Sequence, residues 1–165
     1  MPSPAPLHLP APVVQTLAMV ADALTGVQDP WWLIGGAAVG LQGVQSAVPD
    51  VDVVMSARDA RQVLLKLNIP QGQDGGTALF RSEVFGRWAI PPLPVEFMGG
   101  FRVRTQEGWR LLEPATRKAF LVDGRLLHVP DRQELIDICR GFGRPKDLAR
   151  AEALERLERQ ARSGD

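Results

Sequence analysis

The sequence has few of the residues that form covalent or metal cross-links. It contains one cysteine and two histidines among 165 residues. The single cysteine, Cys139, excludes a disulfide within the chain and is consistent with the reducing cytoplasm, where we expect the protein to reside. His8 and His128 show no ligand spacing with Cys139, so we expect no zinc site.

The chain also lacks an excess of charge of either sign. Its 19 basic and 19 acidic side chains balance, which gives no overall attraction to nucleic acid or anionic lipid. A nucleic-acid substrate would therefore need a local basic patch. The length suits one domain that buries a real hydrophobic core.

A long, uninterrupted hydrophobic run is missing as well. Residues 30–49 carry no charge, but four glycines, two glutamines and a serine interrupt them, and Asp29 and Asp50 flank them. This composition argues against a membrane span, and we expect no membrane association. The proline-rich N-terminus has no charged start, so a signal peptide is not expected either.

The most informative stretch runs from residue 33 to residue 55, LIGGAAVGLQGVQSAVPDVDVVM. It predicts an apolar strand, a Gly-Gly turn, a short helix of small residues and a second apolar strand. Residues two apart in a strand point to the same side of the sheet. Asp50 and Asp52 should therefore project together from one face, while Val51 and Val53 enter the core.

This pattern indicates chemistry on a nucleoside triphosphate. Two neighbouring carboxylates repel each other, and burying them costs several kcal/mol unless a cation pairs with them. Magnesium is the usual cation for such oxygen ligands and usually brings substrate phosphates with it. Gly35 and Gly36 allow a sharp bend close to a ligand, and they open a helix whose N-terminal amides favour phosphate.

The order of these features resembles the signature of the polymerase-beta-like nucleotidyltransferase superfamily: an apolar residue and Gly-Gly, thirteen residues, then Asp-x-Asp between apolar residues. The segment GGAAVGLQGV, at residues 35–44, is most similar to the small bacterial members of this superfamily, the minimal nucleotidyltransferases and the abortive-infection-type toxin enzymes. The resemblance implies a third carboxylate on a later strand. Glu96, in PVEFMGG at residues 94–100, fits because it faces away from Val95 and Phe97. Glu83 and Glu107 are weaker candidates.

The resemblance also implies roles for these residues. Asp50, Asp52 and Glu96 would be catalytic and would hold one or two Mg²⁺ ions, with Glu96 also acting as the general base. The alternative is that all three are ordinary polar residues of strands and strand ends and have no catalytic role.

Nucleotide binding is assigned to a second group of residues. It comprises Gly35, Gly36, Ser46, Arg144 and Lys146, the last two in GRPKDLARAEAL at residues 143–154, which resembles the family's basic-plus-acidic helix start. A solvated helix start is an equally good interpretation of Arg144 and Lys146. Small bacterial members commonly carry arginine and threonine where this chain has Ser46 and Val48. Serine does not replace a bidentate guanidinium beside a triphosphate.

The function that the resemblance implies is transfer of a nucleoside monophosphate from a nucleoside triphosphate, such as ATP, to a hydroxyl, with release of pyrophosphate. The acceptor is left open between tRNA, a protein and a small molecule. The substitutions at Ser46 and Val48 motivate an alternative: a catalytically inactive binding or regulatory module with this fold, as part of a toxin–antitoxin pair.

The expected fold is α/β and nucleotidyltransferase-like, with a short, mixed, twisted sheet, helices packed on one side and a helical C-terminal segment. Residues 1–10 should form a flexible, proline-rich lead-in, and residues 11–165 a single domain with its C-terminal helices from residue 131. Capping boxes are predicted at Ser56 with Asp59 and at Asp131 with Glu134. The glycine-rich residues 71–76 either cover a nucleotide or form a plain connection.

Overall fold

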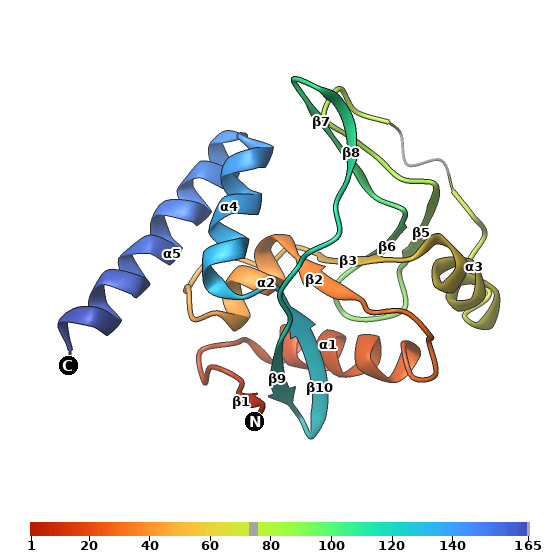
Figure 1. Cartoon of the computed structure of the whole chain (residues 1–165). Coiled ribbons are helices and arrows are strands. Elements are labelled where there is room, and N and C mark those ends of the chain that lie inside the picture. The colour runs from red at the N-terminus through yellow and green to blue at the C-terminus, as the bar shows by residue number, and fades with distance from the viewer. Residues whose placement is uncertain (73–75, 165) are drawn as a thin grey trace.

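A computed structural model describes residues 1–72 and 76–164 of the chain (Figure 1). The predicted loop at residues 71–76 therefore lies partly outside the described residues. The elements along the chain are β1 (Ser3–Pro4), α1 (Ala11–Ala23), β2 (Trp32–Ile34), α2 (Gly35–Leu41), β3 (Val51–Met55), α3 (Ala57–Lys66), β4 (Phe80–Arg81), β5 (Val84–Trp88), β6 (Val95–Gly99), β7 (Arg102–Thr105), β8 (Gly108–Leu111), β9 (Lys118–Val122), β10 (Arg125–Val129), α4 (Arg132–Phe142) and α5 (Pro145–Ser163).

The central sheet has the strand order β2-β3-β6-β5 and is mixed, as predicted. Strand β3 runs antiparallel to β2 and parallel to β6, and β5 closes the other edge antiparallel to β6. Two smaller sheets, β1-β9-β10 and β4-β7-β8, lie beside it. The sequence predicts most of these short strands but not their division into three sheets, because pairing partners leave little trace in the local pattern.

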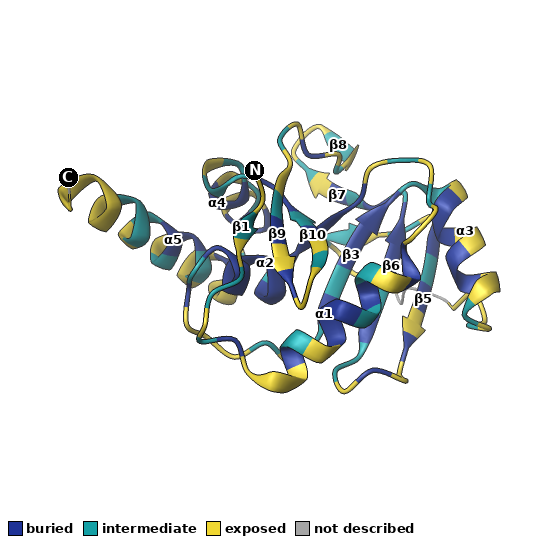
Figure 2. Cartoon of the chain, turned by 90° about the horizontal axis from the view of Figure 1, so that it is seen from below, coloured by how far each residue is buried: buried dark blue, intermediate teal, exposed yellow. Residues whose placement is uncertain are grey.

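The two faces of the central sheet carry different cores. Val51, Val53 and Phe97 are fully buried on the face that packs with α1 and α3. Val54 and Met98 point the other way, into a smaller core that includes Phe80 of β4, Phe101 just before β7 and Phe142 of α4. Figure 2 shows β3 and β6 largely buried, in dark blue, whereas the far end of α5 is exposed. The alternation therefore leaves the side chains at residues 52 and 96 on the face of the smaller core.

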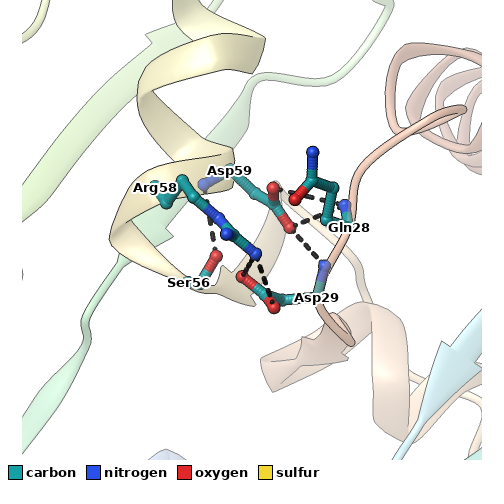
Figure 3. A network of polar contacts seen from close by, with 5 residues as sticks. All are labelled: Gln28, Asp29, Ser56, Arg58 and Asp59. Atoms are coloured by element: carbon teal, nitrogen blue, oxygen red, sulfur yellow. Dashed lines mark hydrogen bonds and ion pairs between the residues drawn. The ribbon is translucent and has the colours of Figure 1, made fainter.

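The predicted N-cap of α3 forms, but its capping box does not. Ser56 accepts a hydrogen bond from the backbone N–H of Asp59 at 3.2 Å. The Asp59 carboxylate, however, accepts from the backbone N–H groups of Gln28 and Asp29, at distances down to 2.7 Å, instead of turning back to Ser56 (Figure 3). Asp59 is 4% exposed, so it ties the loop before β2 to the start of α3. Arg58 adds an exposed ion pair with Asp29.

The same departure occurs at α4. Asp131 accepts from the backbone N–H of Glu134 at 2.8 Å and caps the helix as predicted. The Glu134 carboxylate instead accepts from the backbone N–H groups of Ala115 and Thr116, both at 2.8 Å. In both helices, the third residue holds a distant loop rather than its own N-cap. Local sequence spacing cannot distinguish these two uses of an acidic residue.

The N-terminal lead-in is more structured than its prolines predict. Ser3 and Pro4 form β1, which pairs in parallel with β9, and the backbone N–H of Ala5 donates to Leu121 O at 3.0 Å. Leu9 is buried in the main core. Proline is compatible with such an edge strand because it removes one donor without disturbing the rest of the ladder.

None of the helices in the described part of the chain is long and apolar enough to cross a membrane. Helix α5 is the longest, and it packs against α4 and α2 through its first half (Figure 1). Its buried residues are Asp147, Ala151 and Leu154. The predicted helical C-terminal segment is thus attached to the domain at the end of β2, where the Gly-Gly turn lies.

The Asp59 network predicts a specific loss of stability. Asp59→Ala leaves the partly buried N–H groups of Gln28 and Asp29 without their charged acceptor, so the free energy of unfolding should fall by about 1–3 kcal/mol. Arg58→Ala removes only an exposed ion pair and should cost less than about 1 kcal/mol. Urea unfolding of the two variants checks this, and equal losses would show that the network does not hold the loop.

His128 predicts a pH dependence of stability. Its ring packs edge-on against Trp31, with centroids 5.0 Å apart, and burial, aided by the positive charge of Arg117, lowers the pKa of His128 to about 4. Below a pH of about 6.5 the unfolded chain binds a proton that the folded chain does not, so stability should fall as the pH drops from about 6.5 to about 4. Urea unfolding at both ends of this range should show a smaller fall for His128→Gln than for wild type. His8→Gln serves as the control, and an equal fall in all three proteins would refute the assignment.

Candidate functional site

The three carboxylates predicted from the sequence line one cavity of about 250 Å³. Asp52 on β3 and Glu96 on β6 are direct partners in the parallel pairing of the two strands. Asp50 immediately precedes β3 and lies on the same side. The predicted proximity of Glu96 to the aspartate pair is therefore confirmed, because it follows from the register of the two strands.

Asp52 has a buried carboxyl oxygen and a raised pKa. Its Oδ1 atom is buried and has no hydrogen-bond partner among the residues that the structure describes. Burial, followed by the negative charges of Asp50 and Glu96, raises the pKa of Asp52 to about 8, and Arg150 opposes the shift. The Asp52 and Glu96 carboxyl groups also lie close enough to share a hydrogen bond. A buried carboxyl atom without a partner, next to a second carboxyl, is the arrangement that a cation would stabilise.

Gly35 is required by the position of Asp52. Its φ angle is +70°, and a Cβ atom on Gly35 would lie 2.9 Å from Asp52 Oδ2. A side chain at residue 35 would thus be strained by the backbone and would also push the carboxylate away. The neighbouring Gly36 is buried, and a Cβ atom there would lie 3.3 Å from Arg150 Nη2. The two glycines give space to a carboxylate and to a guanidinium, respectively.

Glu96 is held from its other side by Arg87. The two residues are direct partners between β5 and β6, and their ion pair spans 3.3 Å. The weaker candidates for the third carboxylate lie elsewhere. Glu83 pairs with Arg61 and lines a different cavity, and Glu107 lies in the turn between β7 and β8.

Basic side chains also line the cavity. Arg144 and Lys146, at the start of α5, both line it as predicted. The buried Asp147 accepts from the backbone N–H of Arg144 at 3.3 Å and pairs with its guanidinium, Nε to Oδ2, at 2.5 Å. Arg144 also lies over the ring of Phe80, 4.9 Å from its centroid. The predicted cap by Asp147 is therefore present, and it fixes Arg144 at the same time.

Ser46 is not part of this site. It is exposed and does not line the cavity, so its assignment to nucleotide binding is not supported by its position. The sequence reasoning missed Arg150, which does line the cavity. Arg150 follows Lys146 by four residues and Asp147 by three, so helical spacing places all three on one side of α5. The reasoning also missed the apolar wall, which consists of Ile34, Phe80, Phe85, Met98, Phe101 and Phe142.

The described residues contain no group of three or more histidine, cysteine, aspartate or glutamate side chains arranged to hold a metal ion by themselves. Magnesium commonly takes one or two carboxylates and completes its coordination with substrate phosphates and water. The Asp52 and Glu96 pair, with the unpartnered Asp52 Oδ1, fits that smaller donor set. The metal-binding role of the three carboxylates remains a prediction.

The chain is similar in sequence to part of a longer protein. No protein-family model matches the chain. The UPF0162 protein PA3419 of Pseudomonas aeruginosa is 34% identical over 127 residues, which cover 72% of this chain and 43% of that protein. The chain thus spans less than half the length of this relative, whose name states no activity.

Comparison with solved structures identifies the fold. An inferred nucleotidyltransferase, TM1012 from Thermotoga maritima, superposes with a TM-score of 0.68 at 22% identity, covering 95% of this chain and 98% of that one. The lincosamide antibiotic adenylyltransferase LnuA, bound to lincomycin, gives 0.56 at 14% identity, over 84% and 94% of the two chains. ANT(2")-Ia in complex with adenylyl-2"-tobramycin gives 0.50 at 15% identity, over 91% and 97%. The chain has the polymerase-beta-like nucleotidyltransferase fold, as the sequence resemblance implies.

The contact between Gly35 and Asp52 can be tested by substitution. Gly26 has a φ angle of +89° and nothing near its Cβ position, so Gly26→Ala should cost only backbone strain, about 1–2 kcal/mol. Gly35→Ala adds a clash with Asp52 Oδ2 and should lose at least about 1 kcal/mol more. Denaturant unfolding measures both variants. Equal losses would mean that Asp52 moves away freely and that the glycine does not position it.

Proposed function

We propose that the protein transfers a nucleoside monophosphate from a nucleoside triphosphate to a hydroxyl group. The observation that carries this proposal is the buried, unpartnered Oδ1 atom of Asp52, next to Glu96, in a cavity that basic side chains also line. A carboxylate pair in one cavity with basic side chains suits a metal-bound triphosphate, because the ligand brings both the cation and the anionic oxygens. The nucleotidyltransferase fold supports the same reaction class.

The acidic and the basic residues of the cavity have different roles in the proposed reaction. Asp52 and Glu96, with Asp50 beside them, would hold Mg²⁺, which neutralises charge on the triphosphate and on the departing pyrophosphate. Arg144 and Lys146 would bind phosphate oxygens and keep the α-phosphorus in line with the acceptor.

Glu96 would act as the general base. It accepts the proton of the acceptor hydroxyl while that oxygen forms its bond to the α-phosphorus. The bond between the α-phosphorus and the bridging oxygen breaks at the same time, and pyrophosphate leaves with the electron pair. The aromatic rings along one wall, including those of Phe80 and Phe101, limit the access of water that would compete as the acceptor.

A panel of candidate substrates can identify the acceptor and the base of the nucleotide. The names of LnuA and ANT(2")-Ia associate this fold with the antibiotics lincomycin and tobramycin, which favours a small hydroxylated acceptor among the candidates. A panel of such antibiotics, transfer RNA and protein substrates, each with α-labelled ATP, CTP, GTP and UTP, would identify the labelled product.

A binding or regulatory module that has lost turnover is the second candidate. The position of Ser46 outside the cavity favours it. Such a module would bind a triphosphate in the presence of Mg²⁺ and yield no labelled product with any acceptor of the panel. Within a toxin–antitoxin pair, it would act through its partner rather than through catalysis.

The proposed reaction predicts that Asp52→Asn abolishes transfer and leaves the fold intact. The amide removes a charge that supports several kcal/mol of transition-state stabilisation, so the rate should fall at least about 1,000-fold. Release of labelled pyrophosphate from a γ-labelled triphosphate, in the presence of the acceptor found by the survey, measures the loss.

Glu83→Gln is the matched control, because Glu83 is exposed and lines another cavity. It should retain the wild-type rate, and circular dichroism should show that both variants are folded. An undiminished rate in Asp52→Asn would refute the assignment of this cavity as the active site.

A further inference from the structure

We propose that Arg150 of α5 is a phosphate-binding residue of the cavity. This inference rests on the proposed function and identifies one further residue that binds the triphosphate. Ser46, which the sequence analysis assigns to nucleotide binding, is exposed and does not line the cavity. Arg150 lines the same cavity as Asp52 and lies 98 positions later in the chain.

The guanidinium of Arg150 lies at the Gly-Gly turn. Its Nη2 atom is 3.3 Å from the position of a Cβ atom on Gly36, so it occupies the space that this glycine leaves open. The positive charge of Arg150 also opposes the raised pKa of Asp52, whose Oδ2 atom lies 2.9 Å from the position of a Cβ atom on the adjacent Gly35. A triphosphate whose metal is held by Asp52 would therefore have Arg150 beside its phosphate chain.

Asp147 holds Arg150 in this position. The Asp147 side chain is 1% exposed, and its Oδ1 atom lies 3.6 Å from Arg150 Nη1, while the Arg150 side chain is 18% exposed. The same carboxylate pairs more closely with Arg144. One buried acid thus fixes two guanidinium groups, which reduces the conformational entropy that either would lose on binding a ligand.

The charges of the α5 residues that line the cavity favour an anion. Arg144, Lys146 and Arg150 carry three positive charges and Asp147 carries one negative charge, which leaves two positive charges facing the cavity. In the described part of the chain, Asp147 is the ion-pair partner of Arg150, and that contact uses one edge of the guanidinium. The donors at Nη2 are directed to the Gly-Gly turn, where phosphate oxygens would accept them in a bidentate manner.

A structural alternative assigns Arg150 only to packing between α2 and α5. The two accounts differ in what happens to a ligand that has no base and no ribose. Inorganic tripolyphosphate with Mg²⁺ probes the phosphate site alone, so it reports on Arg150 without knowledge of the preferred nucleotide. Isothermal titration calorimetry of the full chain gives its Kd, and circular dichroism and the Tm report the folded state of each variant.

Arg150→Gln should weaken tripolyphosphate binding by about 10-fold to 100-fold, because it removes one charge-assisted bidentate contact. Arg156→Gln is the matched control: Arg156 is also on α5 but is exposed and lies outside this cavity, and its variant should bind within about twofold of wild type. Arg150→Lys keeps the charge without the planar fork and should give an intermediate loss of several-fold.

The outcomes separate this inference from the function on which it rests. If wild type binds tripolyphosphate and folded Arg150→Gln binds it equally well, or if Arg156→Gln loses as much affinity, Arg150 has no phosphate role and the proposed function stands. If wild type itself does not bind tripolyphosphate with Mg²⁺, both proposals fail. If Arg150→Gln does not fold, Arg150→Lys decides, and a Kd within twofold of wild type overturns the inference.

Discussion

The carboxyl group of Asp52 is buried next to Glu96 without a full set of hydrogen-bond partners, and the surrounding structure is arranged around it. Such a group is costly to bury, and a fold keeps it only where something else compensates. The parallel pairing of β3 and β6 sets Glu96 opposite Asp52, and the left-handed backbone of Gly35 lets the carboxylate lie against the turn. Under the proposed function, a cation bound at Asp52 and Glu96 would offset this cost.

The other half of the cavity depends on α5, so the C-terminal helix is a part of the site rather than an appendage. Asp147, one of the few buried charged residues, fixes Arg144 and Arg150, which line the same cavity as the carboxylates. The cavity thus places acids from the central sheet against bases from a helix far away in the sequence. This separation of charge suits a ligand that carries both a metal ion and phosphates.

Much of this architecture is predictable from local patterns. The alternation around Asp52 and Glu96 defines which side of each strand is polar, and the Gly-Gly turn marks the start of α2. The local pattern does not show which strands pair, so the proximity of the two acids depended on a resemblance. It also does not show that the Asp59 carboxylate binds a distant loop instead of its own helix cap. Nor does it show that Arg150 of α5 lines the cavity whereas Ser46 does not. These features depend on tertiary contacts between segments far apart in the chain.

The most direct test of the account is a crystal structure of the protein with Mn²⁺ and a non-hydrolysable nucleoside triphosphate analogue. Manganese replaces magnesium at oxygen ligands and is located by its anomalous scattering. The account predicts an anomalous peak at the Asp52 and Glu96 carboxylates, within coordination distance of the previously unpartnered Asp52 Oδ1, with the phosphates between them and the start of α5. A peak elsewhere, or a bound analogue that leaves Asp52 without a cation, would contradict it.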